Sequence, residues 1–198
     1  MNMRTLIFNG SPRKSGDTVS LINEMQKYLT GEIKIISAYY YYDKINPCID
    51  CRYCWENIGC CIDDGMREIY EYIKFCNNII IASPVYFSEL SGSLLNILSR
   101  LQCFYTARHF MNKPIEQKNK NGVLILAGGG DGSHERAKST ANILFKMMNT
   151  NCVADVFSLN TNILPASEDS QALQTARDAA LLLNNLYQNN NISPCKFY

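Results

Sequence analysis

The sequence predicts a single α/β domain in which a parallel sheet of five strands lies between two layers of helices. Three observations predict this fold. Short apolar runs alternate with segments of helical periodicity, most of the apolar runs end at residues typical of turns, and no linker or change of composition divides the 198 residues. Because right-handed crossovers place helices on both faces of a parallel sheet, the alternation indicates a three-layer sandwich.

The strands are predicted from apolar runs bounded by turn residues. In chain order they cover residues 4–8, 33–37, 79–82, 122–127 and 153–159. The run 79–82 is apolar on both faces, as a central parallel strand must be. The strand at 33–37 is expected to continue into the tyrosine run 39–42.

The helices are predicted from apolar residues three and four positions apart, which would face the sheet. In chain order they cover residues 15–29, 66–73, 94–101, 134–148 and 171–186. Gly31 ends the first helix, and Asp63 or Asp64 caps the second, because a carboxylate accepts the free N–H groups of a first turn. The cysteine-rich stretch 47–64 is too irregular for an element and is expected to form a loop.

Composition argues against several classes of function. The formal net charge is +1 with both signs interleaved, so the chain offers no basic face to a nucleic acid, and the short basic run 118–120 is interpreted as a solvated loop. The first eight residues lack the features of a signal peptide, and no apolar stretch is long enough to cross a bilayer. The sequence therefore predicts a soluble, cytoplasmic protein without a membrane or nucleic-acid partner.

The loop after the first strand, residues 10–18, has the composition of a phosphate site. In parallel α/β sheets, ligands bind beyond the carboxyl ends of the strands. Glycine lets the backbone approach a ligand, and a helix N-terminus offers unpaired N–H groups. The hydroxyls of Ser11, Ser15 and Thr18 would donate hydrogen bonds to a phosphate, and Arg13 would supply charge.

Two other phosphate loops are excluded by the same residues. No lysine follows Gly16, as a nucleotide P-loop requires, and no G-x-G-x-x-G opens the helix. The alternative is an ordinary strand-to-helix turn in which Ser15 or Asp17 only caps the helix.

Two further loops leave the same edge of the predicted sheet. The segment after the central strand offers Pro84, Tyr86 and Phe87 as flat apolar surface beside backbone amides, which suits an isoalloxazine ring. In the third loop, Gly129 and Gly130 allow backbone to approach a ligand, and His134 is interpreted as a surface residue at a helix start. The alternative in each case is a loop that binds nothing.

With these motifs, nearly the whole chain resembles the flavodoxin-like NADPH-dependent FMN reductase family, and within it the iron-sulfur flavoproteins. The turn G-S-P-R-x-x-G-x-T at 10–18 and the segment S-P-V-Y at 83–86 carry the resemblance. It implies a flavodoxin-like sheet of strand order 2-1-3-4-5 that binds FMN. The implied phosphate ligands are Ser11, Arg13, Ser15, Asp17 and Thr18, and the implied ring contacts are Pro84, Val85, Tyr86 and Phe87.

Asp17 departs from the family, which usually has asparagine at this position. A carboxylate beside a phosphate is mildly repulsive unless it turns away to cap the helix. The substitution therefore predicts weaker retention of FMN.

The cysteines Cys48, Cys51, Cys54 and Cys60 form a motif that resembles the compact cluster-binding motif of the iron-sulfur flavoproteins. Three thiolates two residues apart can surround a [4Fe-4S] cubane, with the fourth supplied from a short loop closed by glycine. Cys61 could replace Cys60, so the fourth ligand stays open. Zinc fits the spacing less well, and the alternative is a set of reduced thiols packed near the flavin or at a subunit interface.

The remaining cysteines have no predicted role. Cys76, Cys103 and Cys152 lie in apolar surroundings and are expected to be small buried side chains. Cys195 lies in a terminal tail and is expected to be idle.

The resemblance implies an oxidoreductase in which FMN accepts a hydride from NADH or NADPH. The electrons would pass to a quinone, a flavin or a similar small acceptor, or to a redox protein through a cluster. No catalytic side chain is expected, because the flavin N5 carries the chemistry. A homodimer or homotetramer is implied, with the tyrosine run and the cysteine loop as candidate interfaces.

Two other functions stay open. One is a flavodoxin-type electron carrier without nicotinamide activity, against which the near-neutral charge argues because carriers tend to be acidic. The other is a redox or metal sensor built on the cysteine loop.

Overall fold

The computed structural model describes residues 2–41, 43–130 and 132–191, and within them five long strands form one parallel sheet. The strands are β1 (Arg4–Asn9), β2 (Glu32–Ser37), β3 (Asn78–Tyr86), β5 (Lys120–Gly128) and β6 (Thr150–Leu159). They lie in the order β2-β1-β3-β5-β6, which is the predicted 2-1-3-4-5 when the long strands are counted in chain order. The two-residue strand β4 (Glu89–Leu90) pairs antiparallel with the end of β3.

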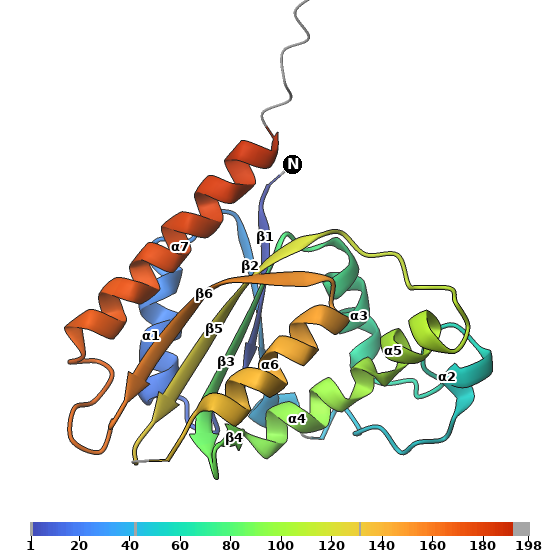
Figure 1. Ribbon diagram of the computed structural model, residues 1–198, viewed down its shortest axis with the longest axis horizontal. Helices are drawn as coiled ribbons and strands as arrows, with labels where there is room; N and C mark the ends of the chain where they lie inside the picture. Colours follow the sequence, from blue (N-terminus) through green and yellow to red (C-terminus); the bar gives the residue numbers. More distant parts are fainter. Residues whose placement is uncertain (1, 42, 131, 192–198) are drawn as a thin grey trace, which may run out of the picture.

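Helices cover both faces of the sheet (Figure 1). On one face lie α1 (Asp17–Gln26) and α7 (Ser170–Asn191), and on the other lie α3 (Met66–Phe75), α4 (Gly92–Leu98) and α6 (Glu135–Met147). The three-layer prediction is therefore confirmed. No helix in the described part of the chain is both long enough and apolar enough to cross a membrane.

The central strand β3 connects the two cores that these layers enclose. Successive strand residues point to opposite faces. Ile79 and Ile81 belong to the core beneath α3, α4 and α6, whereas Ile80 belongs to the core beneath α1 and α7, and all three are fully buried. The doubly apolar pattern that predicted a central strand is explained by these two contacts.

The tyrosine run does not extend β2, contrary to the sequence prediction. Residues Ala38–Tyr41 form a short 3-10 helix, and Tyr42 lies outside the described residues. Strand β2 pairs only with β1, and the last residue of each, Ser37 and Asn9, are partners. Because β1 ends at Asn9, the described residues after Ser37 have no neighbouring strand residue to pair with.

Two short helices were absent from the prediction. Helix α2 (Tyr53–Glu56) lies inside the cysteine-rich stretch, and α5 (Gln102–His109) follows α4 after the 3-10 turn Ser99–Leu101. The two helices contact each other, and the rings of Trp55 and Phe110 meet edge to face with centroids 4.9 Å apart. Tertiary contact therefore stabilises α2, which is too short to persist alone.

The basic run 118–120 is only partly the solvated loop that the sequence indicated. Lys120 begins β5 and is 3% exposed, and its Nζ donates to the Lys118 carbonyl at 2.7 Å. Burial lowers the pKa of Lys120 to about 8, because the charged amine loses contact with water.

Gly31 joins α1 to β2 in a conformation that only glycine adopts easily, with φ of +86°, and a Cβ there would lie 2.2 Å from the Met3 carbonyl oxygen. We expect Gly31→Ala to reduce the free energy of unfolding by about 1–3 kcal/mol, which is the cost of a strained left-handed residue. Urea unfolding followed by circular dichroism measures this loss.

The matched control is Gly92→Ala at the start of α4, where a Cβ would meet nothing within 4 Å and no positive φ occurs. We expect it to change stability by less than about 1 kcal/mol. An equal effect of both substitutions would contradict the explanation.

Candidate functional site

The carboxyl ends of β1, β3, β5 and β6 open onto one cavity of about 340 Å³. This is the edge of a parallel sheet at which cofactors bind, and the volume suits a small organic molecule. The cavity brings together these residues of the sequence prediction: Ser11, Arg13, Asp17, Thr18, Pro84, Val85, Tyr86, Gly129 and Gly130.

The turn after β1 is fixed to the neighbouring strand and helix. The Gly10 N–H donates to the Ala82 carbonyl at 2.7 Å, and Ser91 Oγ donates to the Gly10 carbonyl at 2.8 Å. A Cβ on Gly10 would lie 2.7 Å from Ser91 Oγ, so glycine is required for this close approach. Within the turn, Ser11 Oγ accepts the Arg13 N–H at 3.2 Å. The turn is therefore held in shape before any ligand binds.

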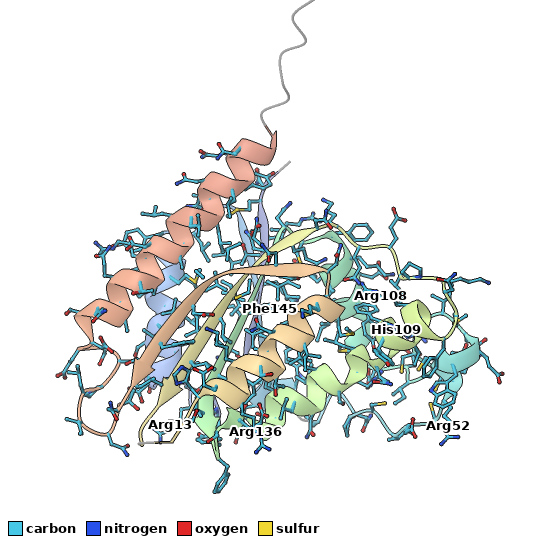
Figure 2. The ribbon with its side chains drawn as sticks, in the orientation of Figure 1. Arg13, Arg52, Arg108, His109, Arg136 and Phe145 are labelled. Atoms are coloured by element: carbon cyan, nitrogen blue, oxygen red, sulfur yellow. The ribbon has the colours of Figure 1, made fainter. Side chains whose placement is uncertain are left out.

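The first turn of α1 borders the cavity and has no side-chain cap. Asp17 does not cap it, because its Oδ1 accepts the Ala166 N–H at 2.9 Å and so faces the loop after β6. The first N–H groups of α1 therefore remain available to an anion, with the positive end of the helix dipole behind them. Arg13 lies at the same edge, near the ends of β5 and β6 (Figure 2).

The loop after β6 adds two residues that sequence reasoning missed, Thr161 and Asn162. The Thr161 N–H donates to the Gly128 carbonyl at 2.9 Å, and the Asp17 contact holds the same loop farther along. The rule that identified the other three loops also applies to this one, because it follows the carboxyl end of a strand. Its ordinary composition gave no further signal.

Gly129 lies close to the Asn162 side chain, where this loop meets the third predicted loop. A Cβ there would lie 2.5 Å from Asn162 Oδ1, whereas a Cβ on Gly130 would meet nothing. Asp131, between the two ends of the third loop, lies outside the described residues. His134 stands at the start of α6 with its ring against Phe157, and it is not part of the cavity lining.

Two residues of the prediction are not in the cavity lining, Phe87 and Ser15. Phe87 and Ser88 have φ of 53° and 65° and form the two-residue turn between the paired residues Tyr86 and Glu89. Two left-handed residues in a two-residue hairpin are typical of a type I′ turn, and at its tip the Phe87 side chain is fully exposed. Ser15 is exposed in the turn before α1.

The cysteine motif lines a second cavity that shares no lining residue with the first. Cys48, Cys51, Cys54 and Cys60 border it, as does Cys61. In the described part of the chain, no three His, Cys, Asp or Glu side chains converge as a single metal ion requires. A four-iron cubane separates its thiolate ligands more widely than one ion does. The cavity has a volume of only about 20 Å³, so the cysteine side chains would have to move apart to surround such a cluster.

Cys60 and Cys61 have different surroundings. Cys60 is half-buried and packs against the core, as does Cys54, whereas Cys61 is exposed with its Sγ 3.5 Å from Cys51 Sγ. The backbone N–H of Tyr53, with the neighbouring Cys61 thiol, lowers the pKa of Cys51, and Cys51 in turn raises the pKa of Cys61.

A buried arginine contacts both ends of the segment 47–61, which contains the cysteine motif and is called the cysteine loop below. The Arg100 side chain has no exposed surface. Its Nη1 donates to Asp64 Oδ2 at 2.7 Å and to the Asn46 carbonyl at 2.8 Å, and its Nη2 donates to the Ile62 carbonyl at 3.2 Å. Sequence reasoning missed this residue, because nothing local distinguishes a buried arginine from a surface one.

Asp64 completes the contact and settles which aspartate caps α3. Its Oδ1 accepts the Met66 N–H and its Oδ2 accepts the Asn46 N–H, both at 3.0 Å. Burial opposes the charged form, but the hydrogen bonds from Arg100 and these amides outweigh it and lower the pKa of Asp64. Asp63 instead forms an exposed ion pair with Arg67.

The other described cysteines pack in the apolar core, as predicted, but Cys103 also borders the cysteine cavity and Cys152 is not fully buried. Cys76 and Cys103 are buried and Cys152 is half-buried. Burial raises the pKa of Cys76 to about 12 and the pKa of both others to about 11, which favours the neutral thiol at neutral pH. Cys195 lies outside the described residues.

Comparison with known sequences gives one family for most of the chain. The model of the family described as NADPH-dependent FMN reductase matches residues 3–162. An iron-sulfur flavoprotein of Methanocaldococcus jannaschii is 35% identical over 134 residues, which are 67% of this chain and 66% of the relative. The match thus spans just under two thirds of that relative's length.

Comparison with solved structures shows the same flavodoxin-like fold. An NAD(P)H:quinone oxidoreductase from Methanothermobacter marburgensis superposes with a TM-score of 0.68 at 14% identity, over 91% of this chain and 95% of the other. An FMN-dependent NADH-azoreductase from Bacillus anthracis, solved in complex with FMN, gives a TM-score of 0.61 at 19% identity, over 91% and 99%.

Proposed function

The chain belongs to the NADPH-dependent FMN reductase family, whose members are oxidoreductases, and from this premise we propose that it uses bound FMN to oxidise NADH or NADPH. The observation that supports this best is the cavity at the carboxyl edge of the sheet. It joins the uncapped start of α1 to the apolar segment 84–86, and FMN requires both a phosphate site and a wall for its ring.

At the phosphate end, we propose that Ser11, Arg13 and Thr18 bind the monophosphate together with the first N–H groups of α1. Arg13 would supply the charge and the hydroxyls would donate hydrogen bonds. Asp17 lies beside them, but its Oδ1 is held by the Ala166 N–H. Its remaining negative charge would weaken, without preventing, the binding of the phosphate.

At the ring end, Pro84, Val85 and Tyr86 would form the apolar wall, and Gly129 and Gly130 would let backbone amides approach the ring. Bound FMN supplies hydride acceptance and electron transfer, so the chain's own residues only need to bind and orient it. Tyr86 is 46% exposed at the rim of the cavity, which leaves the ring accessible to a nicotinamide and then to a small acceptor such as a quinone or a flavin.

We also propose that Cys48, Cys51, Cys54 and Cys60 hold a [4Fe-4S] cluster. Their shared cavity supports this, as does the name of the 35% identical relative. Cys61 is the weaker candidate for the fourth ligand, because a sulfur 3.5 Å from Cys51 Sγ is too close for both to occupy separate corners of a cubane. A cluster would carry electrons one at a time between the flavin and a protein acceptor.

We propose that the chain forms a homodimer or homotetramer. Its candidate contact surfaces are the exposed Tyr39 and Tyr40 and the cysteine loop with the exposed Trp55 beside it.

The reductase proposal predicts that nicotinamide reduces the bound flavin directly. We expect anaerobic addition of NADH or NADPH to the FMN-loaded protein to bleach the flavin absorption band, because the hydride acceptor is the oxidised ring. Stopped-flow absorption measures the rate with each cofactor. A flavin that bleaches with dithionite but with neither nicotinamide would leave only the electron-carrier function.

The phosphate site predicts opposite effects for two charge changes in one turn. We expect Arg13→Ala to weaken FMN binding by about tenfold or more, the worth of a hydrogen bond to a charged group. Asp17→Asn keeps an Oδ1 acceptor for Ala166 but removes the negative charge, so we expect it to tighten binding by about two- to fivefold. Titration of the FMN-free protein by flavin fluorescence quenching measures both.

Lys14→Ala is the matched control, because Lys14 lies in the same turn over the Tyr40 ring and does not line the cavity. Its effect should be less than twofold. If all three variants bound FMN equally, the phosphate would lie elsewhere.

The cysteine assignment predicts a difference between two adjacent residues. We expect Cys60→Ser to abolish or strongly reduce bound iron and sulfide, and Cys61→Ser to leave them unchanged, because Cys60 packs on the core whereas Cys61 is exposed. Iron and sulfide analysis of anaerobically purified protein measures this. The reverse result would assign the fourth ligand to Cys61.

A further inference from the structure

We propose that Arg100 is a positioning residue of the cysteine site, which holds the two ends of the cysteine loop together and sets the reduction potential of the cluster through its buried charge. This inference rests on the [4Fe-4S] cluster proposed above. Three observations carry it: the contacts of Arg100 to both ends of the loop, its place in the wall of the cavity, and the charges around it.

The segment around Arg100 anchors the cysteine loop at several points. The guanidinium contacts Asn46 before the first cysteine and Ile62 after the last. The neighbouring Ser99 Oγ accepts the N–H of Cys48 at 3.0 Å. Behind them, the Tyr70 hydroxyl donates to the Arg100 carbonyl at 2.9 Å. The loop is thus attached at both ends to one segment, which limits how far the cysteines between them can move.

Arg100 also lines the cavity itself, and its Nε is a buried nitrogen without a hydrogen-bond partner. Leaving such a donor unpaired is costly, and buried unpaired groups in native proteins usually have a further partner. The cavity is bordered by cysteine sulfurs, which accept hydrogen bonds when they are thiolates. The Nε therefore has the chemistry of a donor to a sulfur held in this cavity.

Among the described residues that line the cavity, Arg100 is the cation that is buried. Asp50 and Arg52 also line it, but both are exposed and lie 3.8 Å apart as an ion pair. Asp64 offsets part of the Arg100 charge, and yet its own carboxylate is shared with the N–H groups of Asn46 and Met66. Four thiolates around a cluster carry net negative charge, which a neighbouring buried cation attracts.

The sign of the effect follows from this arrangement. Reduction adds one negative charge to the site, and a nearby cation stabilises the reduced form. Removal of the Arg100 charge should therefore lower the reduction potential. Removal of the Asp64 charge should raise it, because a nearby anion disfavours the reduced form.

The test compares the anaerobically purified holoprotein with the variants Arg100→Gln, Asp64→Asn and the double variant. The midpoint potential is measured by electron paramagnetic resonance during a dithionite titration. We expect the reduced-to-oxidised ratio at fixed potential to fall about tenfold in Arg100→Gln, which is about 59 mV for one electron. It should rise in Asp64→Asn and be intermediate in the double variant.

Opposite signs separate an electrostatic role from a structural one. Both single substitutions break the same contact, so loosening of the loop and entry of water would move both potentials in one direction. Arg100→Lys keeps the positive charge but replaces the planar guanidinium with an ammonium group. The midpoint potential of this variant should therefore stay near the wild-type value. Shifts of the same sign in Arg100→Gln and Asp64→Asn would overturn the inference, as would no shift in either.

The same samples separate failure of this inference from failure of the cluster proposal. Iron, sulfide and FMN contents are measured for every protein. Wild-type protein with FMN but no iron would overturn the cluster and the role of Arg100 together, and would leave the reductase proposal standing. If Arg100→Gln loses its cluster, Asp64→Asn decides the matter, because a raised potential supports the inference and an unchanged or lowered one refutes it.

Discussion

The parallel pairing of β1 with β3 is the constraint on which the candidate flavin site depends. Because the strands run in the same direction, their carboxyl ends open at one edge, and the loops that follow them must meet there. The hydrogen bond from Gly10 to Ala82 continues the pairing one step beyond β1. The turn after β1 is thereby placed beside the segment 84–86, although the two are distant in sequence.

Helix α4 connects the two candidate sites. At its start, Ser91 Oγ donates to the Gly10 carbonyl in the phosphate turn. At its end, Ser99 accepts the N–H of Cys48, and Arg100 holds both ends of the cysteine loop. Eight residue steps separate Ser91 from Ser99. At a rise of about 1.5 Å per residue, they lie about 12 Å apart along the helix axis. One short rigid element therefore fixes the distance between a flavin cavity and a thiol cavity.

The sequence predicted the features that depend on local pattern. Alternating apolar runs predicted the sheet and its layers. The glycine, hydroxyl and arginine residues after β1 predicted a ligand-binding turn, and most of these residues line the cavity. Features that depend on contacts between distant segments were missed. The tyrosine run leaves the sheet because β1 ends. Arg100 was missed for the same reason, because its partners lie 36 to 54 positions away. The exposed position of Phe87 has a local cause, the two-residue hairpin between Tyr86 and Glu89, which was not predicted.

The Arg100–Asp64 pair is difficult to explain as a source of stability alone. A buried ion pair gains little net free energy, because both charges lose their hydration, and apolar residues of similar volume often serve as well. The pair here leaves the arginine Nε without a partner, which adds a further cost. A device that only closed the loop would need neither the charge nor the spare donor. Both features have a use if the cavity beside them holds an anionic group with sulfur acceptors, as the surrounding cysteines indicate.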